Sequence, residues 1–531
     1  MDAREWIKNG KAVFGMEFGS TRIKAVLTDT AGTVLAVGSY DWENSLIDGI
    51  WTYSLEEIHA GLRGCYASLR RNVEEKYGVT PESYTAMGFS AMMHGYLPFD
   101  AEGRQLSRFQ TWRNTNTQEA ADALTDLFSF NIPLRWSIAH VYQCMLDKEE
   151  HVAQYDYITT LAGYVHWILT GERVIGIGDA SGMFPIDPET KDYNETMVQA
   201  FDALAEKGGY TWKLRDIFPK VLLAGEPAGV LTEKGAAFLD ESGSLHPGIP
   251  LCPPEGDGDT GVVATNTITK RTGSVSAGTS TFAMVVLEKE LSRVYREIDV
   301  MMTPDGSVLA QSHGNNGTTD LNAWVGLFQE FAALTGGDCE PGHIFETLYK
   351  NSLKGDEDCG GMLSYCFLAG ESLTGINEGR PLFVRKPGSA MNLANFMKAH
   401  IYGSLAIVKM GLDILKNDGV EIDRILGQGG FFKTKEVGQR ALAAAVGTPV
   451  TVMETASEGG AWAIALLASY MAERAAGCGL SLAEYLDQKI FAGMTGVTVT
   501  PTKEEIDGFD RFMKQYKQGL EVEKAAVNAI V

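Results

Sequence analysis

The chain has 531 residues, which is too many for one ordinary hydrophobic core, so we expect two large domains. Its net charge of −23 argues against a nucleic-acid or anionic-membrane partner, and no apolar run approaches the length needed to cross a bilayer. Seven scattered cysteines without zinc-ligand spacing argue against a disulfide framework. Residues 1–11 lack the apolar region of a signal peptide, so the sequence predicts a cytoplasmic protein.

Strand, helix and turn patterns alternate along the chain. Residues 13–40 are expected to form strands, and apolar residues recur at helical spacing over 55–78. Further on in the first domain, the patterns predict a strand at 84–90, a hairpin turn at 97–103, helices at 116–128 and 158–170, and an extended, turn-rich segment at 176–187. In the second domain they predict an exposed loop at 354–362 and helices at 392–416, 434–446 and 460–474. The first domain is expected to span 1–264 and the second 265–531.

Acidic and small residues follow one another in the middle of the chain. Asp257 and Asp259 lie in a glycine-rich turn, and Gly278, Thr279 and Ser280 form a second small-residue turn. Phosphoryl transfer to an alcohol needs a carboxylate that accepts the hydroxyl proton and a slim backbone close to the nucleotide phosphates. Gly278 permits that approach, and the two residues after it can donate hydrogen bonds to phosphate oxygens. An ordinary turn between two strands is the alternative interpretation.

The N-terminal segment contains a second small-residue turn of the same kind. A strand-like segment runs into the glycine turn Gly19-Ser20-Thr21 and then into a second strand-like segment. When the two copies are superposed, Gly19 falls on Gly278 and Ser20 on Thr279. Each copy predicts a strand, a tight turn and a returning strand. Two such loops half a chain apart suggest a duplicated fold with a nucleotide held between the halves.

With these motifs the chain resembles the FGGY carbohydrate kinases of the actin/hexokinase/heat-shock-chaperone superfamily, and most closely the xylulose and ribulose kinases. The matches are collinear and span nearly the whole chain. They are the first phosphate loop at 14–21, the catalytic glycine-aspartate motif at 256–261, the second phosphate loop at 276–280, the adenosine segment at 427–430 and 439–450, and the start of the next helix at 458–463. The resemblance implies an α/β fold of two actin-like (ribonuclease H-like) domains, with mixed sheets, flanking helices and an active-site cleft between them.

The resemblance also implies the activity, which is ATP-dependent phosphorylation of a sugar hydroxyl, most closely that of a ketopentose. Asp259 falls at the position of the general base, and Asp257 is either a turn residue or part of the metal shell. Glu17 and Asp259 are the expected ligands of Mg²⁺. The expected ATP-binding residues are Gly19, Ser20, Thr21, Gly278, Thr279, Ser280, Gly429, Gly430 and Lys433. The expected partners are the sugar and ATP, and a homodimer is left open.

Residues on the substrate side come from the first half of the chain. Met93 and His94 follow a strand and resemble the loop with which xylulose kinases touch the sugar, where a histidine can hydrogen-bond sugar hydroxyls. A histidine packed at a strand end is the plainer alternative. Asn114 and Asp179 also match family segments near the sugar. A helix cap or a turn would explain Asp179 equally well.

The sequence departs from the family pattern in three places. Glu17 stands where an aspartate is usual, so a magnesium contact through water would have a shifted geometry. Asn114 and Asn116 replace a charged pair, and Ala162-Gly163 replaces a lysine and an aspartate. These changes leave the sugar undecided, and a kinase for glycerol or a hexonate would fit the fold equally well.

Two alternatives come from other functional classes. One is an actin- or chaperone-like ATPase that binds a protein, and the methionine-histidine loop speaks against it. The other is a catalytically weak, sugar-binding regulatory homologue, which Glu17 and the lost charged pair favour. Retention of Asp259 speaks against that second alternative.

Overall fold

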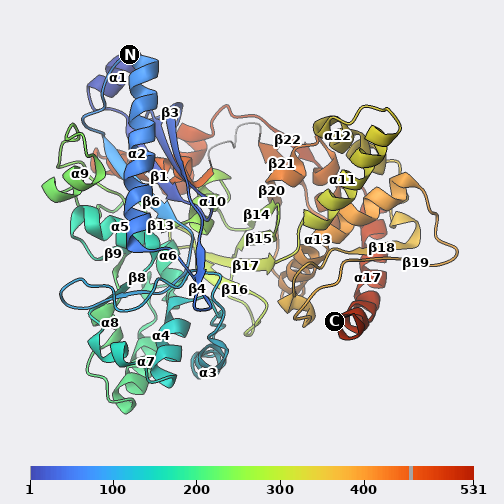
Figure 1. The fold of residues 1–531 in the computed structure, drawn as a ribbon, viewed down its shortest axis with the longest axis horizontal. Coiled ribbons are helices and arrows are strands. Elements are labelled where there is room, and N and C mark those ends of the chain that lie inside the picture. The colour runs from blue at the N-terminus through green and yellow to red at the C-terminus, as the bar shows by residue number, and fades with distance from the viewer. Residues whose placement is uncertain (1, 454–458, 531) are drawn as a thin grey trace. The chain divides into compact units, whose positions relative to one another are not determined.

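The computed structural model describes residues 2–453 and 459–530 (Figure 1). The chain divides into two compact units. Unit 1 comprises Met1–Thr269, Val300–Leu309 and Ala456–Gly493, and unit 2 comprises Lys270–Asp299, Ala310–Thr455 and Met494–Val531. Each unit combines a mixed sheet with helices, which confirms the expected α/β class. The expected boundary between residues 264 and 265 stays a prediction.

Unit 1 is built on a sheet with the strand order β13-β6-β1-β2-β3. The chain forms an antiparallel meander from β1 to β3, while β6 lies parallel to β1, and β13 lies parallel to β6. The strands are β1 (Val13–Phe18), β2 (Arg22–Thr28), β3 (Val34–Asp41), β6 (Ala86–Ala91) and β13 (Glu255–Gly256). The strands expected over 13–40 and 84–90 are therefore confirmed.

Two helices, α2 (Leu55–Tyr77) and α15 (Gly459–Ala475), cover opposite faces of this sheet. Gly15 and Gly38 lie in adjacent rows of the sheet, so they face opposite sides. A Cβ on Gly38 would lie 2.4 Å from the backbone of α2, and a Cβ on Gly15 would lie 2.2 Å from the backbone of α15. Glycine at these positions thus lets both helices approach the sheet backbone closely. The helix expected at 460–474 is confirmed as α15, but it belongs to unit 1.

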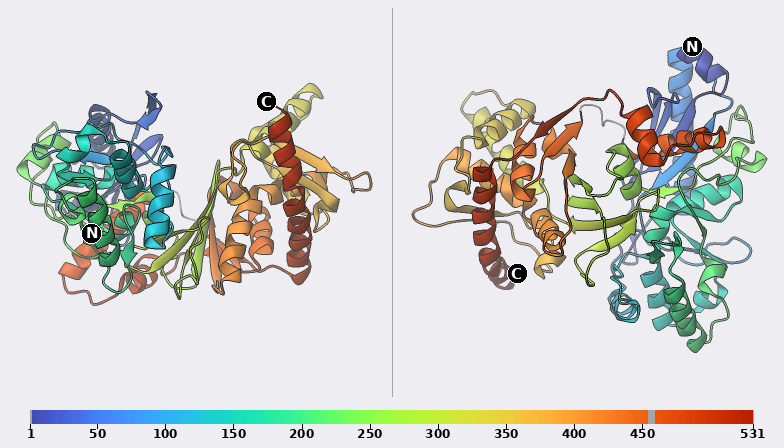
Figure 2. Two further views of the ribbon diagram at one scale, coloured as in Figure 1. Left: turned by 90° about the horizontal axis from the view of Figure 1, so that it is seen from below. Right: turned by 180° about the vertical axis from the view of Figure 1, so that it is seen from behind.

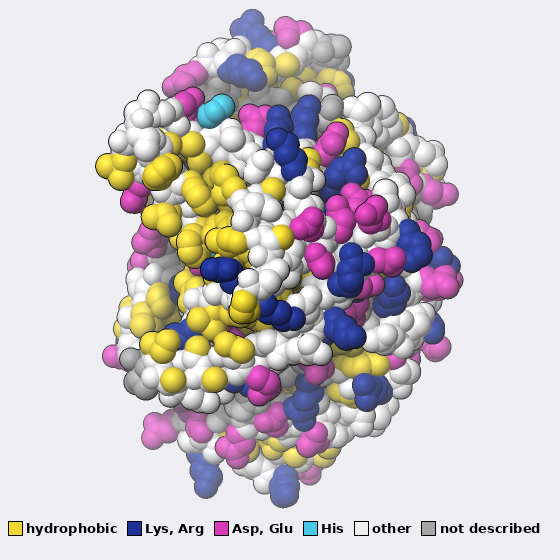
Figure 3. All heavy atoms as spheres, turned by 90° about the vertical axis from the view of Figure 1, so that its right-hand side faces the viewer, with side chains coloured by type: hydrophobic (Ala, Val, Ile, Leu, Met, Phe, Trp, Pro, Cys, Tyr) yellow, Lys and Arg dark blue, Asp and Glu magenta, His cyan; other side chains and the backbone are white. Residues whose placement is uncertain are grey.

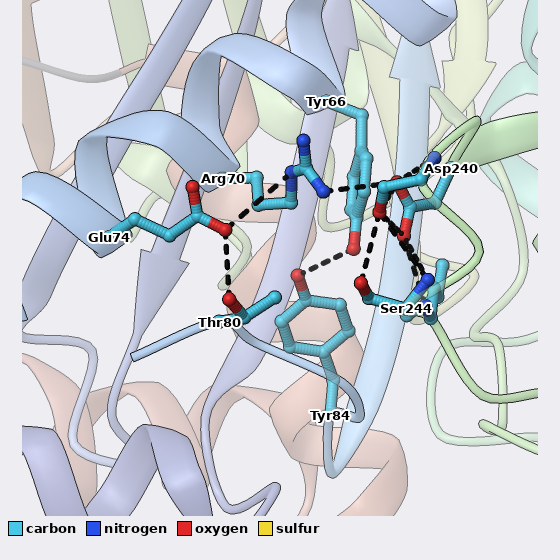
Figure 4. Close-up of polar contacts among 9 residues, drawn as sticks. Tyr66, Arg70, Glu74, Thr80, Tyr84, Asp240 and Ser244 are labelled. Carbon is cyan, nitrogen blue, oxygen red and sulfur yellow. Dashed lines mark hydrogen bonds and ion pairs between the residues drawn. The ribbon is translucent and has the colours of Figure 1, made fainter. Parts of the chain in front are cut away.

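A polar cluster ties α2 to the loop that follows α9 (Glu233–Leu239) (Figure 4). The guanidinium of Arg70 lies 3.8 Å from the carboxylate of Asp240, which accepts the backbone N–H of Ser244 at 3.0 Å. The hydroxyl groups of Tyr66 and Tyr84 lie 3.2 Å apart beside it. Asp240 is buried, and these partners satisfy its charge.

The remaining elements of unit 1 are short. They are α1 (Ala3–Lys8), β4 (Ser45–Ile47), β5 (Ile50–Thr52), β7 (Leu97–Phe99), α3 (Gln118–Phe128), α4 (Ser137–Leu146), η1 (Glu150–Gln154), β8 (Tyr157–Thr159), α5 (Leu161–Thr170), β9 (Val174–Gly176), α6 (Ile177–Ser181), β10 (Ile186–Asp187), β11 (Asp192–Tyr193), α7 (Glu195–Lys207), α8 (Leu214–Ile217), β12 (Lys220–Leu222), α10 (Asp257–Ala264), β16 (Asp299–Met302), α16 (Leu482–Tyr485) and η5 (Leu486–Ile490).

Two expectations for this unit need correction. Residues 158–170 do not form one helix, because β8 occupies their start and Thr160 caps α5 through the N–H of Gly163. The segment 176–187 is not simply extended, because it contains α6. Three glycines in this segment obscure its helical turn in the sequence.

Unit 2 has a sheet with the strand order β17-β15-β14-β20-β21-β22. Strands β14 and β15 form an antiparallel hairpin, and β20 lies parallel to β14, as β6 does to β1. Helix α13 packs against β15, and α14 packs against β21 (Figure 2). The order β17-β15-β14-β20-β21 therefore repeats β3-β2-β1-β6-β13, which supports the expected duplication.

The strands of unit 2 are β14 (Thr272–Ala277), β15 (Thr281–Val286), β17 (Val308–Gly314), β18 (Met362–Tyr365), β19 (Leu382–Arg385), β20 (Arg424–Gln428), β21 (Val450–Met453) and β22 (Gly496–Val499). Its helices are α11 (Thr319–Leu334), α12 (Pro341–Ser352), η2 (Cys359–Gly361), η3 (Ser372–Thr374), α13 (Leu393–Asn417), η4 (Gly430–Phe432), α14 (Val437–Val446) and α17 (Lys503–Ala529). The helices expected at 392–416 and 434–446 are confirmed as α13 and α14.

Apolar side chains gather on part of the surface shown in Figure 3, and charged side chains of both signs are interspersed over the rest. In unit 2 the exposed apolar residues include Leu327, Phe331 and Leu334 of α11. Over residues 2–453 and 459–530, no helix is both long enough and apolar enough to span a membrane.

Candidate active site

Polar side chains form a row across the carboxyl ends of the parallel strands of unit 1. Glu17 on β1 lies opposite Lys24 on β2 and opposite Ser90 on β6, and Ser90 in turn lies opposite Glu255 on β13. Residues paired in this way point to the same face of a sheet. Ligand sites of α/β sheets form at the carboxyl ends of parallel strands. This row therefore marks the candidate site of unit 1.

Glu17, the predicted metal ligand, lies against the N-terminus of α15. A Cβ on Gly460 would lie only 2.1 Å from Oε1 of Glu17. The pKa of Glu17 is raised to about 7, chiefly by burial and secondly by the negative charge of Asp257. Lys24 and the backbone N–H groups at the start of α15 act in the opposite direction. Among the described residues, no group of three or more His, Cys, Asp or Glu side chains is arranged to hold a metal ion.

The acidic segment is the start of helix α10, not a turn between strands. Gly256 is the N-cap residue, Asp257 is the first helical residue and Asp259 is the third. The helix continues because Val262 and Val263 are buried against the interior. The glycines of this segment have low helix propensity, so the sequence reads as a turn.

The two aspartates of α10 differ in their exposure. Asp257 is exposed, and its Oδ1 accepts the backbone N–H of Met93 at 3.0 Å. Surrounding protein still raises the pKa of Asp257 by desolvation, while the N–H donors lower it. Asp259 is 0% exposed, and neither carboxylate oxygen has a hydrogen-bond partner among the described residues. A Cβ on Gly178 would lie 2.3 Å from Cγ of Asp259, so the backbone of α6 closes over it.

Three carboxyl groups, those of Asp179, Glu255 and Asp259, are buried together next to Asp257. The backbone N–H of Asp179 donates to Oε2 of Glu255 at 3.0 Å, and Oγ1 of Thr160 donates to Oδ2 of Asp179 at 2.6 Å. The pKa of each group is raised, chiefly by burial and also by neighbouring negative charges, and that of Asp179 reaches about 7. Glu255 is a site residue that the sequence motifs do not predict, and its signal is a glutamate at a strand end just before the Gly-Asp motif.

Met93 contacts Asp257, and His94 packs against Gly182 at the end of α6, while the substrate-binding role of both residues stays a prediction. His94 is buried, has a φ of 67° and places Nδ1 3.3 Å from the carbonyl oxygen of Gly182. Its ring stacks on Trp136 with the ring centroids 6.4 Å apart. A Cβ on Gly182 would lie 2.7 Å from Nδ1 of His94 and 3.3 Å from Cε of Met93. The glycines of the α6 segment thus make room for these side chains.

The side-chain amide of Asn114 bonds the backbone of β5 and of its own loop. Its Oδ1 accepts the N–H of Trp51 at 2.9 Å, and its Nδ2 donates to the carbonyl oxygens of Trp51 at 2.8 Å and Thr111 at 3.1 Å. Both amide hydrogens have acceptors in these bonds. The structure therefore shows that Asn114 holds its loop against β5, and its sugar-binding role stays a prediction.

The first phosphate loop, residues 19–21, joins β1 to β2. Trp42 Nε1 donates to the carbonyl oxygen of Gly19 at 2.7 Å, and the hydroxyl of Tyr53 donates to that of Ser20 at 2.6 Å. The two aromatic rings stack with their centroids 4.1 Å apart. Because a trans peptide points its N–H opposite to its C=O, the N–H groups of Ser20 and Thr21 point away from these aromatic side chains. Such amides can donate to a phosphate.

The second phosphate loop, residues 278–280, joins β14 to β15. The N–H of Gly317 donates to the carbonyl oxygen of Thr279 at 2.8 Å, and the N–H of Thr318 donates to that of Gly278 at 2.8 Å. The same peptide geometry then points the N–H groups of Thr279 and Ser280 away from residues 317 and 318. A Cβ on Gly278 would meet no atom within 4 Å. The loop therefore has an open face, as the sequence prediction requires.

The predicted adenosine residues lie beside this loop in unit 2. Gly429 has a φ of 100°, and a Cβ there would lie 2.4 Å from the carbonyl oxygen of Ala277, which precedes the loop. Gly430 has open space at its Cβ position, and the side chain of Lys433 is exposed. The predicted segment 458–463 begins with Glu458, which lies outside the described residues.

Comparison with known proteins decides the family. The models of the N-terminal and C-terminal domains of the FGGY family of carbohydrate kinases match residues 12–264 and 273–472, which is most of the chain. The chain belongs to this family of carbohydrate kinases. The predicted family and enzyme class are thus confirmed, and the alternative of a protein-binding ATPase is set aside.

The kinase is similar to several named relatives. It is 21% identical over 488 residues to a xylulose kinase of Staphylococcus xylosus, covering 86% of this chain and 90% of that protein. It is 23% identical over 467 residues to a ribulokinase of Geobacillus thermodenitrificans, covering 79% of each. A solved xylulose kinase of Lactobacillus acidophilus has a TM-score of 0.76 at 16% identity, covering 98% of this chain and 99% of that one. A glycerol kinase of Plasmodium falciparum with ADP has a TM-score of 0.70 at 14% identity, covering 98% of each.

Proposed function

We propose that this kinase transfers a phosphoryl group from ATP to a hydroxyl group of a ketopentose of the xylulose or ribulose type. Family membership and the named xylulose and ribulose relatives support this substrate class. The observation that carries the proposal is the hydrogen bond from the backbone N–H of Met93, the residue before His94, to the exposed carboxylate of Asp257. A sugar held by His94 would present a hydroxyl group to that carboxylate.

Asp257 is our candidate for the general base. A base must come within hydrogen-bond distance of the hydroxyl group it deprotonates, and Asp257 is exposed whereas Asp259 is not. The raised pKa of Asp257 makes it a better proton acceptor than an ordinary aspartate. Our proposal therefore moves the base from Asp259, expected from the sequence, to Asp257. Asp259 then belongs to the buried carboxyl group cluster beneath it.

The two phosphate loops and the glycines of the adenosine segment fit ATP as the phosphoryl donor. In each loop the carbonyl groups are bonded within their own unit, so the amides can donate to phosphate oxygens. The negative charge of Asp257 helps to raise the pKa of Glu17, and neighbouring carboxylates of this kind suit a divalent cation. We propose these two residues, in place of Glu17 and Asp259, as the residues that would hold Mg²⁺, with water completing its shell. Bound magnesium would offset the charge of the phosphates.

The proton and phosphoryl transfers balance in a simple way. The carboxylate of Asp257 takes the hydroxyl proton as the sugar oxygen forms a bond to the γ-phosphorus, and ADP leaves when the bond between the β- and γ-phosphates breaks. His94 would orient the sugar through its ring nitrogens. Enclosure of the reacting groups would limit hydrolysis of ATP by water.

The proposal is tested by ATP consumption with D-xylulose, L-ribulose, glycerol and D-gluconate, each compared with a sample without sugar. Consumption should rise severalfold with at least one ketopentose. A rise with glycerol or gluconate alone would show that the substrate is not a ketopentose, but it would leave the proposed kinase activity in place, since solved glycerol and gluconate kinases share this fold. No rise with any of them would favour the regulatory homologue.

A further inference from the structure

A buried polar chain in unit 2 connects the second phosphate loop to a glutamate far from it in the sequence. The residues 315–318, which we call the clamp segment, lie directly after β17. As described above, its last two residues donate to the carbonyl oxygens of the loop at Gly278 and Thr279. The hydroxyl of Thr318 adds a second bond to the carbonyl oxygen of Gly278, at 3.0 Å.

The contact between clamp segment and loop has no spare room. A Cβ on Gly317 would lie 2.3 Å from the carbonyl oxygen of Gly278 and 3.0 Å from that of Thr279. Only glycine therefore permits this approach of two backbones. Any shift of the clamp segment would move the loop carbonyls and, through the planar peptides, the amides on their other side.

Asn316 fixes the clamp segment from behind. It is buried, and its Oδ1 accepts the N–H groups of Leu368 at 2.8 Å and Ala369 at 2.9 Å. Its Nδ2 donates to the carbonyl oxygen of Ala369 at 2.9 Å and to Oε1 of Glu371 at 2.8 Å. The backbone N–H of Asn316 donates to the same Oε1, also at 2.8 Å.

Glu371 is therefore the anchor of this chain of contacts. It is 1% exposed, and Oε2 has no hydrogen-bond partner among the described residues, so Oε1 carries its bonds to Asn316. The pKa of Glu371 is about 7, because burial raises it by more than the N–H donors of Asn316 and Asn315 lower it. Burying a carboxyl group with one unpartnered oxygen costs free energy, and packing alone would not need such a group here.

We propose that Glu371 is a positioning residue that holds the clamp segment in place and so aims the amides of the second phosphate loop at the nucleotide phosphates. This inference rests on the proposed function, because it needs ATP at that loop. Glu371 lies behind the clamp segment, bonds Asn316 and would not touch the substrate. Its effect should appear in the binding of phosphates and not in the binding of the nucleoside.

The test is calorimetric titration of the whole protein with MgATP and, separately, with adenosine. Glu371→Leu removes the acceptor, and its MgATP affinity should fall by about tenfold or more, as expected when one or two charge-assisted hydrogen bonds are misaligned. Its adenosine affinity should stay within about twofold, because adenosine has no phosphate to bind. Glu371→Gln keeps an acceptor oxygen and should restore most of the MgATP affinity.

Two further variants separate positioning from general damage. Glu523→Leu is the matched control, since Glu523 is also buried in unit 2 but accepts the N–H of Arg380 instead. It should leave MgATP affinity unchanged at temperatures where the protein stays folded. In Gly317→Ala, the added Cβ pushes the second phosphate loop away from the clamp segment. This variant should also lose affinity for MgATP but not for adenosine. It therefore tests the inference if Glu371→Leu fails to fold.

The outcomes are distinct. Equal MgATP affinity in the unsubstituted protein and in folded Glu371→Leu or Gly317→Ala would overturn the inference and leave the kinase proposal intact. Parallel loss of MgATP and adenosine affinity would also overturn it, because the residue would then be merely structural. Absence of MgATP binding by the unsubstituted protein would overturn the proposed function and this inference with it.

Discussion

The backbone N–H of Met93 donates to Oδ1 of Asp257 at 3.0 Å, and this bond joins the loop after β6 to the start of α10. It orients the one exposed carboxylate of α10, and His94 is the next residue of the same loop. The predicted sugar-side segment and the proposed base thus follow β6 and β13, which are neighbours in the sheet although they are far apart in the sequence.

The first prediction distinguishes the two aspartates of α10. Asp257→Asn keeps the size of the side chain but removes the proton acceptor, so kcat should fall by about 100-fold or more while MgATP still binds. Asp259→Asn replaces a buried carboxyl group and should lower kcat much less. The measurement is steady-state kinetics of both variants. A larger fall in kcat for Asp259→Asn than for Asp257→Asn would identify Asp259 as the base.

The second prediction concerns Glu17 and magnesium. If Glu17 holds the ion through water, Glu17→Gln should raise the Mg²⁺ concentration needed for half-maximal turnover, and Glu17→Asp should be tolerated. The measurement is a magnesium titration of turnover for the three proteins. Identical curves would mean that Glu17 only supports the N-terminus of α15.

The third prediction concerns His94 and its left-handed backbone. His94→Ala should raise KM for the sugar more than KM for ATP, because the ring is lost from the sugar side. Alanine also strains a residue with a φ of 67°, whereas asparagine tolerates this conformation. His94→Asn therefore controls for the backbone, and it should share the effect on the sugar with less loss of thermal stability. Equal changes in both KM values would argue that His94 is a packing residue.

The fourth prediction concerns stability and pH. The pKa of Asp179 is raised from 3.8 to about 7 in the folded protein, so its native carboxyl group holds a proton that the unfolded chain has already lost. The stabilisation that comes from this bound proton is fully present below the unfolded pKa and is lost as the pH rises through about 7. The Asp179→Asn variant has no carboxyl group to ionise at this position. Its free energy of unfolding relative to that of the unsubstituted protein should therefore be greater at pH 8 than at pH 4 by about 1 kcal/mol or more. Chemical unfolding at both pH values measures this, and a difference that does not depend on pH would contradict the raised pKa.

Local pattern predicted much of the fold. The two glycine hairpins, the amphipathic helix α2 and the long helix α13 are visible in the sequence because their periodicity or turn residues are local. The pattern could not place α15 in unit 1, since that depends on the packing of its backbone against Gly15 of a strand far away in the chain.

The site was predicted less completely than the fold. The loop residues and the Met93-His94 step lie where the motifs indicate, but exposure separates Asp257 from Asp259, and exposure is set by how α6 closes over α10. Glu255 and Glu371 carry no local motif of their own. Their importance comes from burial and from bonds to distant backbone, neither of which leaves a periodic signal.

The most direct test is to identify the product. The kinase is incubated with MgATP and each ketopentose, and the reaction is followed by ³¹P NMR and mass spectrometry. We predict a sugar phosphomonoester formed in equal amount to ADP, and its loss in Asp257→Asn. Release of ADP and inorganic phosphate without a phosphorylated sugar, for ketopentoses, polyols and sugar acids alike, would contradict the account.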